Sequence, residues 1–359
     1  MSTQYNYVFF LFHVCAIYPL TPAFKATFTK RVFYKLLALI NVIIGFTSCA
    51  LVLSMAMYTN NAVLSTSMMV VNASNLLHRY ILIKKLNHLE KIANILGEFT
   101  KSGNKSEGIF WIKMFIILNV SSSIFILFYK LLIGGMHADI SFFLFGFHFE
   151  DQLFNDIVSS LFDIFALLYG SLPMMTFAFF YIAVCNDLRC ILKHFIKSLK
   201  DKKWFNYEDI LHSYSAIKST VSGIDNTIGV LVFTTLISNS NVMCLSLYVA
   251  LTPNNFQDPV EQISIYYSFL IIFALFVMMT VSASSVAEAS SVVGSIALTM
   301  PEDKRSSFNH QRFITMAEKE ITLTVWKICP INRSFVFGII GIIFTYIIMF
   351  HTLSPFQKP

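Results

Sequence analysis

Charged residues are scarce in this chain. Asp, Glu, Lys and Arg make up 13% of its 359 residues, whereas soluble domains average roughly 25%. Hydrophobic residues make up 56%, and 37 of them are Phe. So little polar surface excludes a soluble globular protein of this length. The composition predicts one membrane-embedded unit in place of the two or three soluble domains that length alone would suggest.

The motifs of soluble enzymes are also missing. The sequence contains no GxSxG, no HExxH and no Walker loop, and its histidines are scattered. No pair of cysteines has metal-ligand spacing, and none lies in a segment that we expect outside the cell. We therefore expect no enzyme activity, no cofactor, no metal and no disulfide framework. The cysteines are Cys15, Cys49, Cys185, Cys190, Cys244 and Cys329.

Long apolar runs, by contrast, are plentiful. A membrane-spanning helix needs about 20 mostly apolar residues. The predicted fold class is therefore all-α, a polytopic membrane protein with seven transmembrane helices. Residues 7–18 are apolar but too short to span, and they predict an uncleaved amphipathic or membrane-surface segment. The predicted spans are 36–58, 61–83, 109–133, 156–186, 228–252, 263–285 and 334–353.

Positive charge lies on one side of this arrangement. Every Lys and Arg except Lys130 and Lys358 falls in the N-terminal arm or close to the second-to-third, fourth-to-fifth or sixth-to-seventh connection. Cytoplasmic loops hold the excess of Lys and Arg, because these side chains are costly to carry across a bilayer. The N-terminus is therefore predicted to be cytoplasmic, and an odd number of spans places the C-terminus outside the cell.

The basic connections are predicted to be structured. Apolar residues at helical spacing over 187–203 and 208–224, and more weakly over 305–325, predict helices that extend the spans into the cytosol. Their apolar stripes pack either within one subunit or against another subunit. The predicted parts are a cytoplasmic arm with the short amphipathic segment (1–35), four spans (36–186), cytosolic helices (187–227), two spans (228–285), cytosolic anchor helices (286–333) and the seventh helix with a short outer tail (334–359).

The outer halves of several spans carry hydrogen-bonding and aromatic side chains. A small-molecule site between helices needs an apolar lining with a few polar groups, although tyrosines at this depth also serve as interface anchors. Asp163 is the clearest ionisable residue inside a span, and such residues are costly and usually functional. The candidate ligand-binding residues are Ser122, Tyr129, Asp163, Tyr169, Asn241, Tyr266 and Tyr267.

The last span is short, with two glycines in its first half and polar residues in its second. Thr345 and Thr352 are seven residues apart and lie on nearly the same face, with Met349 nearly between them. Such a narrow face suits a pore lining that is gated by dewetting, and packing within the bundle is the alternative. The candidate pore and gate residues are Thr345, Tyr346, Met349, Thr352 and Leu353.

This C-terminal segment resembles the end of insect gustatory receptors. It reads CPINRSFVFGIIG over 329–341 and continues to Thr345 and Tyr346. The last helix of that family carries Thr-Tyr, then hydrophobic residues, then Gln-Phe. Thr345 and Tyr346 match this motif, whereas Thr352 stands in place of Gln and Leu353 in place of Phe. The inside N-terminus and short outer loops extend the resemblance along the chain.

The resemblance implies a gustatory-type chemoreceptor, a ligand-gated non-selective cation channel that a small-molecule tastant opens from the outer half of the bundle. It implies a homotetramer, or a heteromer with related receptors, whose seventh helices line a central pore. The implied partners are the tastant, permeant cations and membrane lipid, with no nucleic acid. The implied location is the plasma membrane of sensory neurons, where the chain is a multi-pass membrane protein.

Other classes of membrane protein stay open as alternatives. An odorant receptor subunit has the same architecture but usually a different last-helix pattern. A seven-helix G-protein-coupled receptor needs its N-terminus outside, which the charge distribution opposes. A transporter usually shows internal repeats and paired helix breaks, and we find neither in the sequence. Glycosylation acceptor patterns at Asn104 and Asn332 separate these alternatives, because we expect both to be cytosolic and unmodified.

Overall fold

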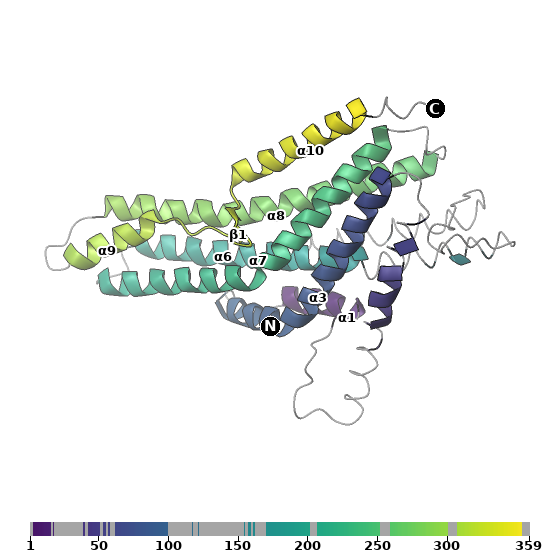
Figure 1. The fold of residues 1–359 in the computed structure, drawn as a ribbon. Coiled ribbons are helices and arrows are strands. Elements are labelled where there is room, and N and C mark those ends of the chain that lie inside the picture. The colour runs from purple at the N-terminus through teal and green to yellow at the C-terminus, as the bar shows by residue number, and fades with distance from the viewer. Residues whose placement is uncertain are drawn as a thin grey trace, which may run out of the picture.

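The computed structural model is a bundle of long helices (Figure 1). It describes residues 3–15, 17, 39, 42–50, 53–54, 57, 62–99, 117, 121, 154, 157–158, 161, 170–201, 207–251, 259–300 and 307–353. The elements along the chain are α1 (Thr3–Val14), α3 (Ala62–Phe99), α6 (Leu172–Lys200), α7 (Tyr207–Leu251), α8 (Pro259–Thr299), α9 (Ser307–Glu318), β1 (Thr324–Val325), β2 (Cys329–Pro330) and α10 (Arg333–Leu353).

Three of the described helices are long and apolar enough to cross a membrane, over Leu172–Lys200, Tyr207–Tyr248 and Ile265–Thr299. They overlap the predicted fourth, fifth and sixth spans. The predicted second span forms the first half of α3, and the predicted seventh coincides with α10. Residues 39, 42–50, 53–54 and 57 of the predicted first span are described and helical, whereas the predicted third span is described only at 117 and 121. The all-α, polytopic class is confirmed.

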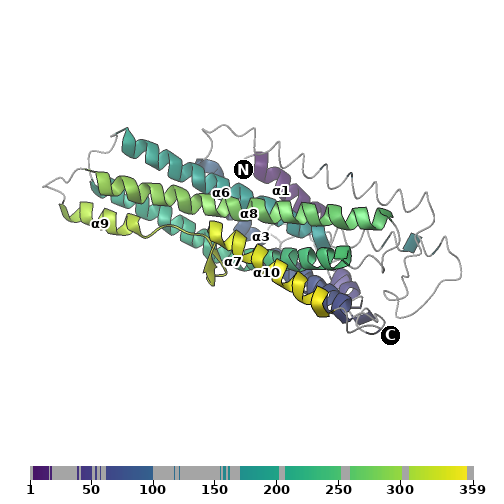
Figure 2. The same cartoon turned by 90° about the horizontal axis from the view of Figure 1, so that it is seen from above.

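α7 and α8 are much longer than a bilayer requires. α7 has 45 residues and α8 has 41, which at 1.5 Å per residue gives about 68 Å and about 62 Å. A hydrocarbon core about 30 Å thick accounts for roughly half of each helix. The other halves continue without a break beside α6 and α9 (Figures 1 and 2). We call this α9 end of the bundle the base. The predicted helical extensions of the spans are therefore present.

α1 forms from the short apolar segment at the start of the chain. Tyr5 and Phe12 are fully buried against the bundle. The Tyr5 hydroxyl donates to Asp187 Oδ2 of α6 at 2.7 Å. Arg79 of α3 donates from Nη2 to the Cys15 carbonyl at 2.8 Å, which satisfies a carbonyl at the carboxyl end of α1. α1 therefore ties α3 to α6.

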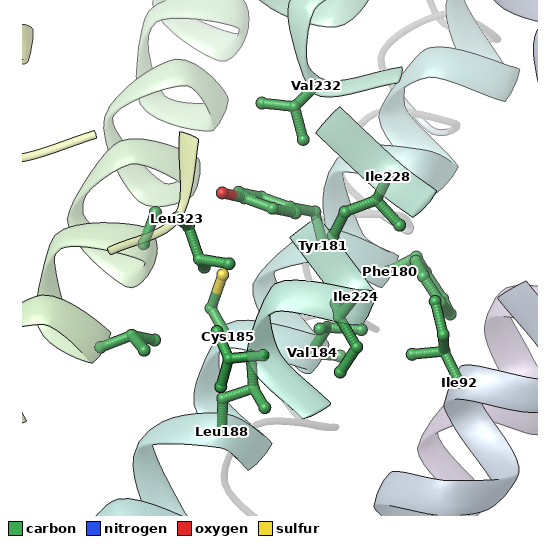
Figure 3. Packing of buried hydrophobic residues seen from close by; sticks show 14 of the residues in the cluster. Ile92, Phe180, Tyr181, Val184, Cys185, Leu188, Ile224, Ile228, Val232 and Leu323 are labelled. Atoms are coloured by element: carbon green, nitrogen blue, oxygen red, sulfur yellow. The ribbon is translucent and has the colours of Figure 1, made fainter. Parts of the chain in front are cut away.

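The core between α6 and α7 is apolar near the base. Tyr181 and Cys185 of α6 face Ile224 and Ile228 of α7, and Leu323, from the segment before β1, lies beside them (Figure 3). All five side chains are buried. The segment between α9 and α10 is therefore part of the core and not a surface loop.

The predicted helix over 305–325 is wrong beyond Glu318, where α9 ends. The chain then becomes extended and forms the two-stranded β1–β2 sheet. Ile321, Leu323 and Val325 are buried, and the two threonines between them are half-buried. This two-residue alternation is the period of a strand and not of a helix.

Candidate functional site

α10 contacts the rest of the chain through one narrow face. Val336, Ile339 and Ile343 pack against the core, at the spacing of one helix face. α10 lies at the edge of the bundle, beside α7 and α8 (Figures 1 and 2). At Gly338 and Gly341 an added Cβ would have no neighbour within 4 Å. Most of this apolar helix is therefore uncovered in the single chain.

Of the candidate pore residues, Thr345 and Met349 lie on the uncovered side of α10, whereas Tyr346 is seven residues after Ile339 and lies on nearly the same face as Ile339. At 100° per residue, Thr345 is on the opposite side of the helix from Ile343. Thr345, Tyr346 and Met349 are all exposed, and the Thr345 hydroxyl donates to the Gly341 carbonyl at 2.9 Å. The backbones of Thr352 and Leu353 form the last turn of α10, while their side chains lie outside the described residues.

The first turn of α10 is capped and tied to α8. Asn332 Oδ1 accepts hydrogen bonds from the Phe335 backbone nitrogen at 3.0 Å and from the Ser334 hydroxyl at 2.7 Å. Asn is among the preferred residues at this position, because its side chain satisfies a helix N–H that has no partner within the helix. Arg333 Nε donates to Glu288 Oε1 of α8 at 2.6 Å, in an exposed pair.

A strained hairpin precedes this first turn; we define the hairpin as residues 323–331. β1 and β2 pair in antiparallel fashion, and Ile328 N–H donates to the Val325 carbonyl at 2.9 Å. The two residues inside this turn, Trp326 and Lys327, have φ angles of 49° and 59°. A left-handed backbone costs roughly 1–2 kcal/mol for each residue with a side chain. Such a conformation persists where its surroundings over-determine it.

One stripe of α7 provides those surroundings. Asp225 accepts two hydrogen bonds from Thr324, from the backbone nitrogen at 2.8 Å and from the hydroxyl at 2.6 Å. One turn further along α7, a Cβ on Gly229 would lie 3.4 Å from the backbone N and Cα of Trp326. Another turn further, the ring centroids of Phe233 and Trp326 are 5.0 Å apart. The four-residue spacing places these three α7 residues on one face.

A buried tyrosine joins the helices of the base. Tyr214 of α7 stacks on Phe195 of α6 with ring centroids 5.6 Å apart, and meets Phe313 of α9 edge-on at 5.8 Å. Its hydroxyl lies 3.3 Å from Ser290 Oγ of α8. Ser290 Oγ also accepts a hydrogen bond from Ile321 N–H at 2.9 Å. The start of the segment that leads to the hairpin is therefore fixed to α8.

α9 is held closely to its neighbours. A Cβ on Gly294 of α8 would lie 3.1 Å from the Ala317 carbonyl oxygen of α9, so only Gly fits there without a shift. Lys218 of α7 donates from Nζ to the carbonyls of Met316 and Lys319 at 3.1 Å and 3.0 Å. A cation at a helix carboxyl end satisfies free carbonyls and the helix dipole.

The candidate ligand residues are only partly described. Asn241 is half-buried in α7 and donates to the Ile237 carbonyl at 3.1 Å. Tyr266 is exposed and Tyr267 half-buried near the start of α8. α7 ends and α8 begins at the same end of the bundle, opposite the base (Figure 1). The other four candidates, Ser122, Tyr129, Asp163 and Tyr169, lie outside the described residues.

Buried polar groups extend from these residues toward the base. His78 of α3 lies 2.9 Å from the Thr234 hydroxyl of α7 through Nδ1. Ser238 donates to Asn75 Oδ1 at 3.3 Å. Asn239 is buried, and its amide nitrogen has no hydrogen-bond partner within the described residues. These bonds join α3 to α7, because unpaired polar groups in an apolar environment are costly.

Comparisons with known proteins place these elements in a wider group. Residues 158–357 match the family model described as Trehalose receptor. No curated protein sequence matches the chain. The solved insect olfactory receptor OR5 from Machilis hrabei is similar in structure, with a TM-score of 0.67, 15% identity and 96% of each chain covered. In the complex of that receptor with eugenol, the values are 0.64, 17% and 98% of each chain. At these sequence identities, the similarity shows that this chain shares the fold of that receptor and shows nothing further about its role.

Proposed function

This chain belongs to the trehalose receptor family of insect gustatory receptors, and we propose that it is a subunit of a ligand-gated, non-selective cation channel opened by a small-molecule tastant. The resemblance of its last helix to gustatory receptors is thereby confirmed at the level of the family. The observation that carries the channel proposal is the direction of α10. The face with Thr345 and Met349 points away from the bundle, opposite Ile343, which is buried.

Four copies of α10 around one axis would cover that face and enclose a pore. Support comes from the glycines of α10, since Gly338 and Gly341 present no side chain and permit close helix approach. Thr345, Tyr346, Met349, Thr352 and Leu353 then form the pore lining and gate. The channel is a homotetramer of this subunit or a heteromer with related receptors. The long α6–α8 extensions at the base supply the contact between subunits.

The tastant site lies in the outer half of the bundle, among polar and aromatic side chains. The family description names trehalose, a sugar with many hydroxyl groups, so trehalose is the first ligand to test. Hydroxyl groups suit a site with several hydrogen-bonding side chains in an apolar lining. The proposed site residues are Ser122, Tyr129, Asp163, Tyr169, Asn241, Tyr266 and Tyr267.

The base faces the cytoplasm in this proposal. The long basic connections then lie inside the cell, as the distribution of Lys and Arg favours. The N-terminus is cytoplasmic, the end of α10 reaches the outer surface, and the receptor resides in the plasma membrane of sensory neurons. A tag on the N-terminus that antibody detects on intact cells would contradict this orientation.

The proposal is tested by expressing the chain by itself and recording from excised patches. Trehalose, a panel of other sugars and a panel of volatile odorants are applied while guanine nucleotides are withheld and G proteins are blocked. We expect a ligand-evoked cation current that survives this block. A current that disappears with G-protein signalling would favour a G-protein-coupled receptor. A response confined to volatile odorants would favour an odorant receptor subunit, the class to which the structural neighbour OR5 belongs.

A further inference from the structure

We propose that Asp225, Gly229 and Phe233 are positioning residues that couple α7 to α10 through the hairpin. The inference rests on the proposed function, in which α10 lines the pore. It deepens that function by assigning the contacts through which a displacement of α7 reaches the start of the pore helix.

α7 extends without interruption from the outer half of the bundle to the base. It is one helix over Tyr207–Leu251, and it carries both the ligand candidate Asn241 and the hairpin contact Asp225. At 1.5 Å per residue these two positions are about 24 Å apart along one helix. Because an unbroken helix is stiff along its axis, a shift produced at the outer end is carried to the stripe at the hairpin.

The three stripe contacts hold the hairpin against sliding. Asp225 binds Thr324 through two hydrogen bonds, the Trp326 backbone lies 3.4 Å from the position that a Cβ on Gly229 would take, and Phe233 contacts the Trp326 ring. They are spaced one helical turn apart along α7. The hairpin therefore cannot slide along α7 or tilt from it without losing at least one contact, and α7 and the hairpin move together.

The hairpin is also joined closely to α10. Only Ile331 and Asn332 separate β2 from α10. Ile331 N–H donates to the Leu323 carbonyl at 2.9 Å, which continues the strand pairing up to the helix cap. Little slack is left between Pro330 and Arg333. Since α10 packs on the bundle through one narrow face, a displaced hairpin moves the first turn of α10.

The matched test uses two glycines of α7. Gly229→Val places a branched side chain against the Trp326 backbone, whereas Gly223→Val adds the same side chain where nothing lies within 4 Å. Both variants change helix propensity equally, so they differ in the hairpin contact. Asp225→Asn is a second variant, which removes the charge that Thr324 binds. We measure ligand concentration–response curves, maximal current per surface channel and melting temperature.

We expect Gly229→Val and Asp225→Asn to raise the half-maximal ligand concentration by about tenfold, which corresponds to about 1.4 kcal/mol, or to lower the maximal current by about tenfold. Gly223→Val should stay within about twofold of the wild type, and all proteins should have similar melting temperatures. If wild-type current is present and Gly229→Val and Asp225→Asn respond like the wild type, the coupling is overturned while the channel assignment stands.

Hydrogen exchange supplies a readout that needs no current. The purified Gly229→Val and Asp225→Asn proteins should exchange the amides of Ile328, Ile331 and Phe335 faster than the wild type does, and Gly223→Val should not. If the wild type carries no ligand-evoked current, the proposed function fails, and the link from α7 to α10 is judged on this exchange. Unchanged exchange at these amides in both variants would overturn the link.

Discussion

Arg333, the first residue of α10, donates from Nε to the Glu288 carboxylate of α8 at 2.6 Å, and both side chains are exposed. This hydrogen bond and the charge of Glu288 raise the pKa of Arg333. The pair joins the start of the candidate pore helix to the helix that runs beside it. An exposed pair is screened by solvent and salt, so it aligns the two helices more than it stabilises them.

The first prediction concerns this pair. Glu288→Arg places two cations together and should lower the melting temperature of the purified protein slightly. The swap Glu288→Arg/Arg333→Glu restores opposite charges and should recover most of the loss. The shift should shrink in high salt because the charges are screened. Equal melting temperatures for the single and the double variant would show that the two residues do not interact.

The second prediction concerns the buried tyrosine of the base. Tyr214→Ala removes a ring that contacts Phe195 and Phe313, and should cost about 3–5 kcal/mol, as large aromatic truncations do. Tyr214→Phe keeps the ring and removes only the hydroxyl beside Ser290, at a cost of about 0.5–1.5 kcal/mol. Thermal unfolding in detergent ranks the two variants. Similar losses in both would mean that the hydroxyl, and not the ring packing, dominates.

The third prediction concerns the strained turn. Lys327 has a φ of 59° and an exposed side chain, so Lys327→Gly should relieve about 1 kcal/mol of backbone strain. The Trp326 ring and its contact with Phe233 stay in place. We expect a higher melting temperature and slower exchange of the hairpin amides. Lys327→Ala is the matched control, since it removes the same side chain without relieving the strain. Equal behaviour of Gly and Ala would contradict this account.

The fourth prediction concerns two cysteines. Cys15 is buried, and burial raises the pKa of its thiol to about 12. Alkylation requires the thiolate, which forms for Cys15 only as pH approaches that value. Cys190 is exposed on the basal part of α6. In permeabilised cells at pH 7–8, a maleimide should label Cys190 and leave Cys15 unlabelled.

The orientation of the bundle is tested with the same reagent. A membrane-impermeant maleimide should leave Cys190 unlabelled on intact cells and label it once the cytoplasmic face is exposed. Cys190→Ser is the control for background labelling. Labelling of Cys190 on intact cells would place the base outside the cell and would oppose the cytoplasmic N-terminus.

The sequence predicts the spans well and the connections less well. Apolar runs are visible because a bilayer demands about 20 such residues in a row, and α10 coincides with the predicted seventh span. The sequence also predicts that 208–224 extends the fifth span, and α7 contains both segments in one helix over Tyr207–Leu251. The polar residues at 225–227 interrupt the apolar pattern of this helix, and the structure shows that the Asp225 carboxylate accepts hydrogen bonds from Thr324 of β1.

The sequence does not predict the hairpin at residues 323–331. Its turn contains Trp326 and Lys327 with positive φ, where hairpins usually carry Asn-Gly, so no turn signal is visible. The alternation of Ile321, Leu323 and Val325 was the available signal. Contacts such as Asp225 with Thr324 join residues 99 positions apart, and a single sequence carries no information about such pairs.

The central claim, that α10 lines a cation-conducting pore, is tested most directly by introducing single cysteines along this helix. A positively charged, thiol-specific reagent is applied from outside while ligand holds the channel open. We expect it to reduce the current in Thr345→Cys, Met349→Cys and Thr352→Cys. Ile343→Cys, at a site buried against the bundle, should be unaffected. Robust ligand-evoked current that the reagent leaves unchanged in the Thr345, Met349 and Thr352 variants, with labelling confirmed, would remove α10 from the pore.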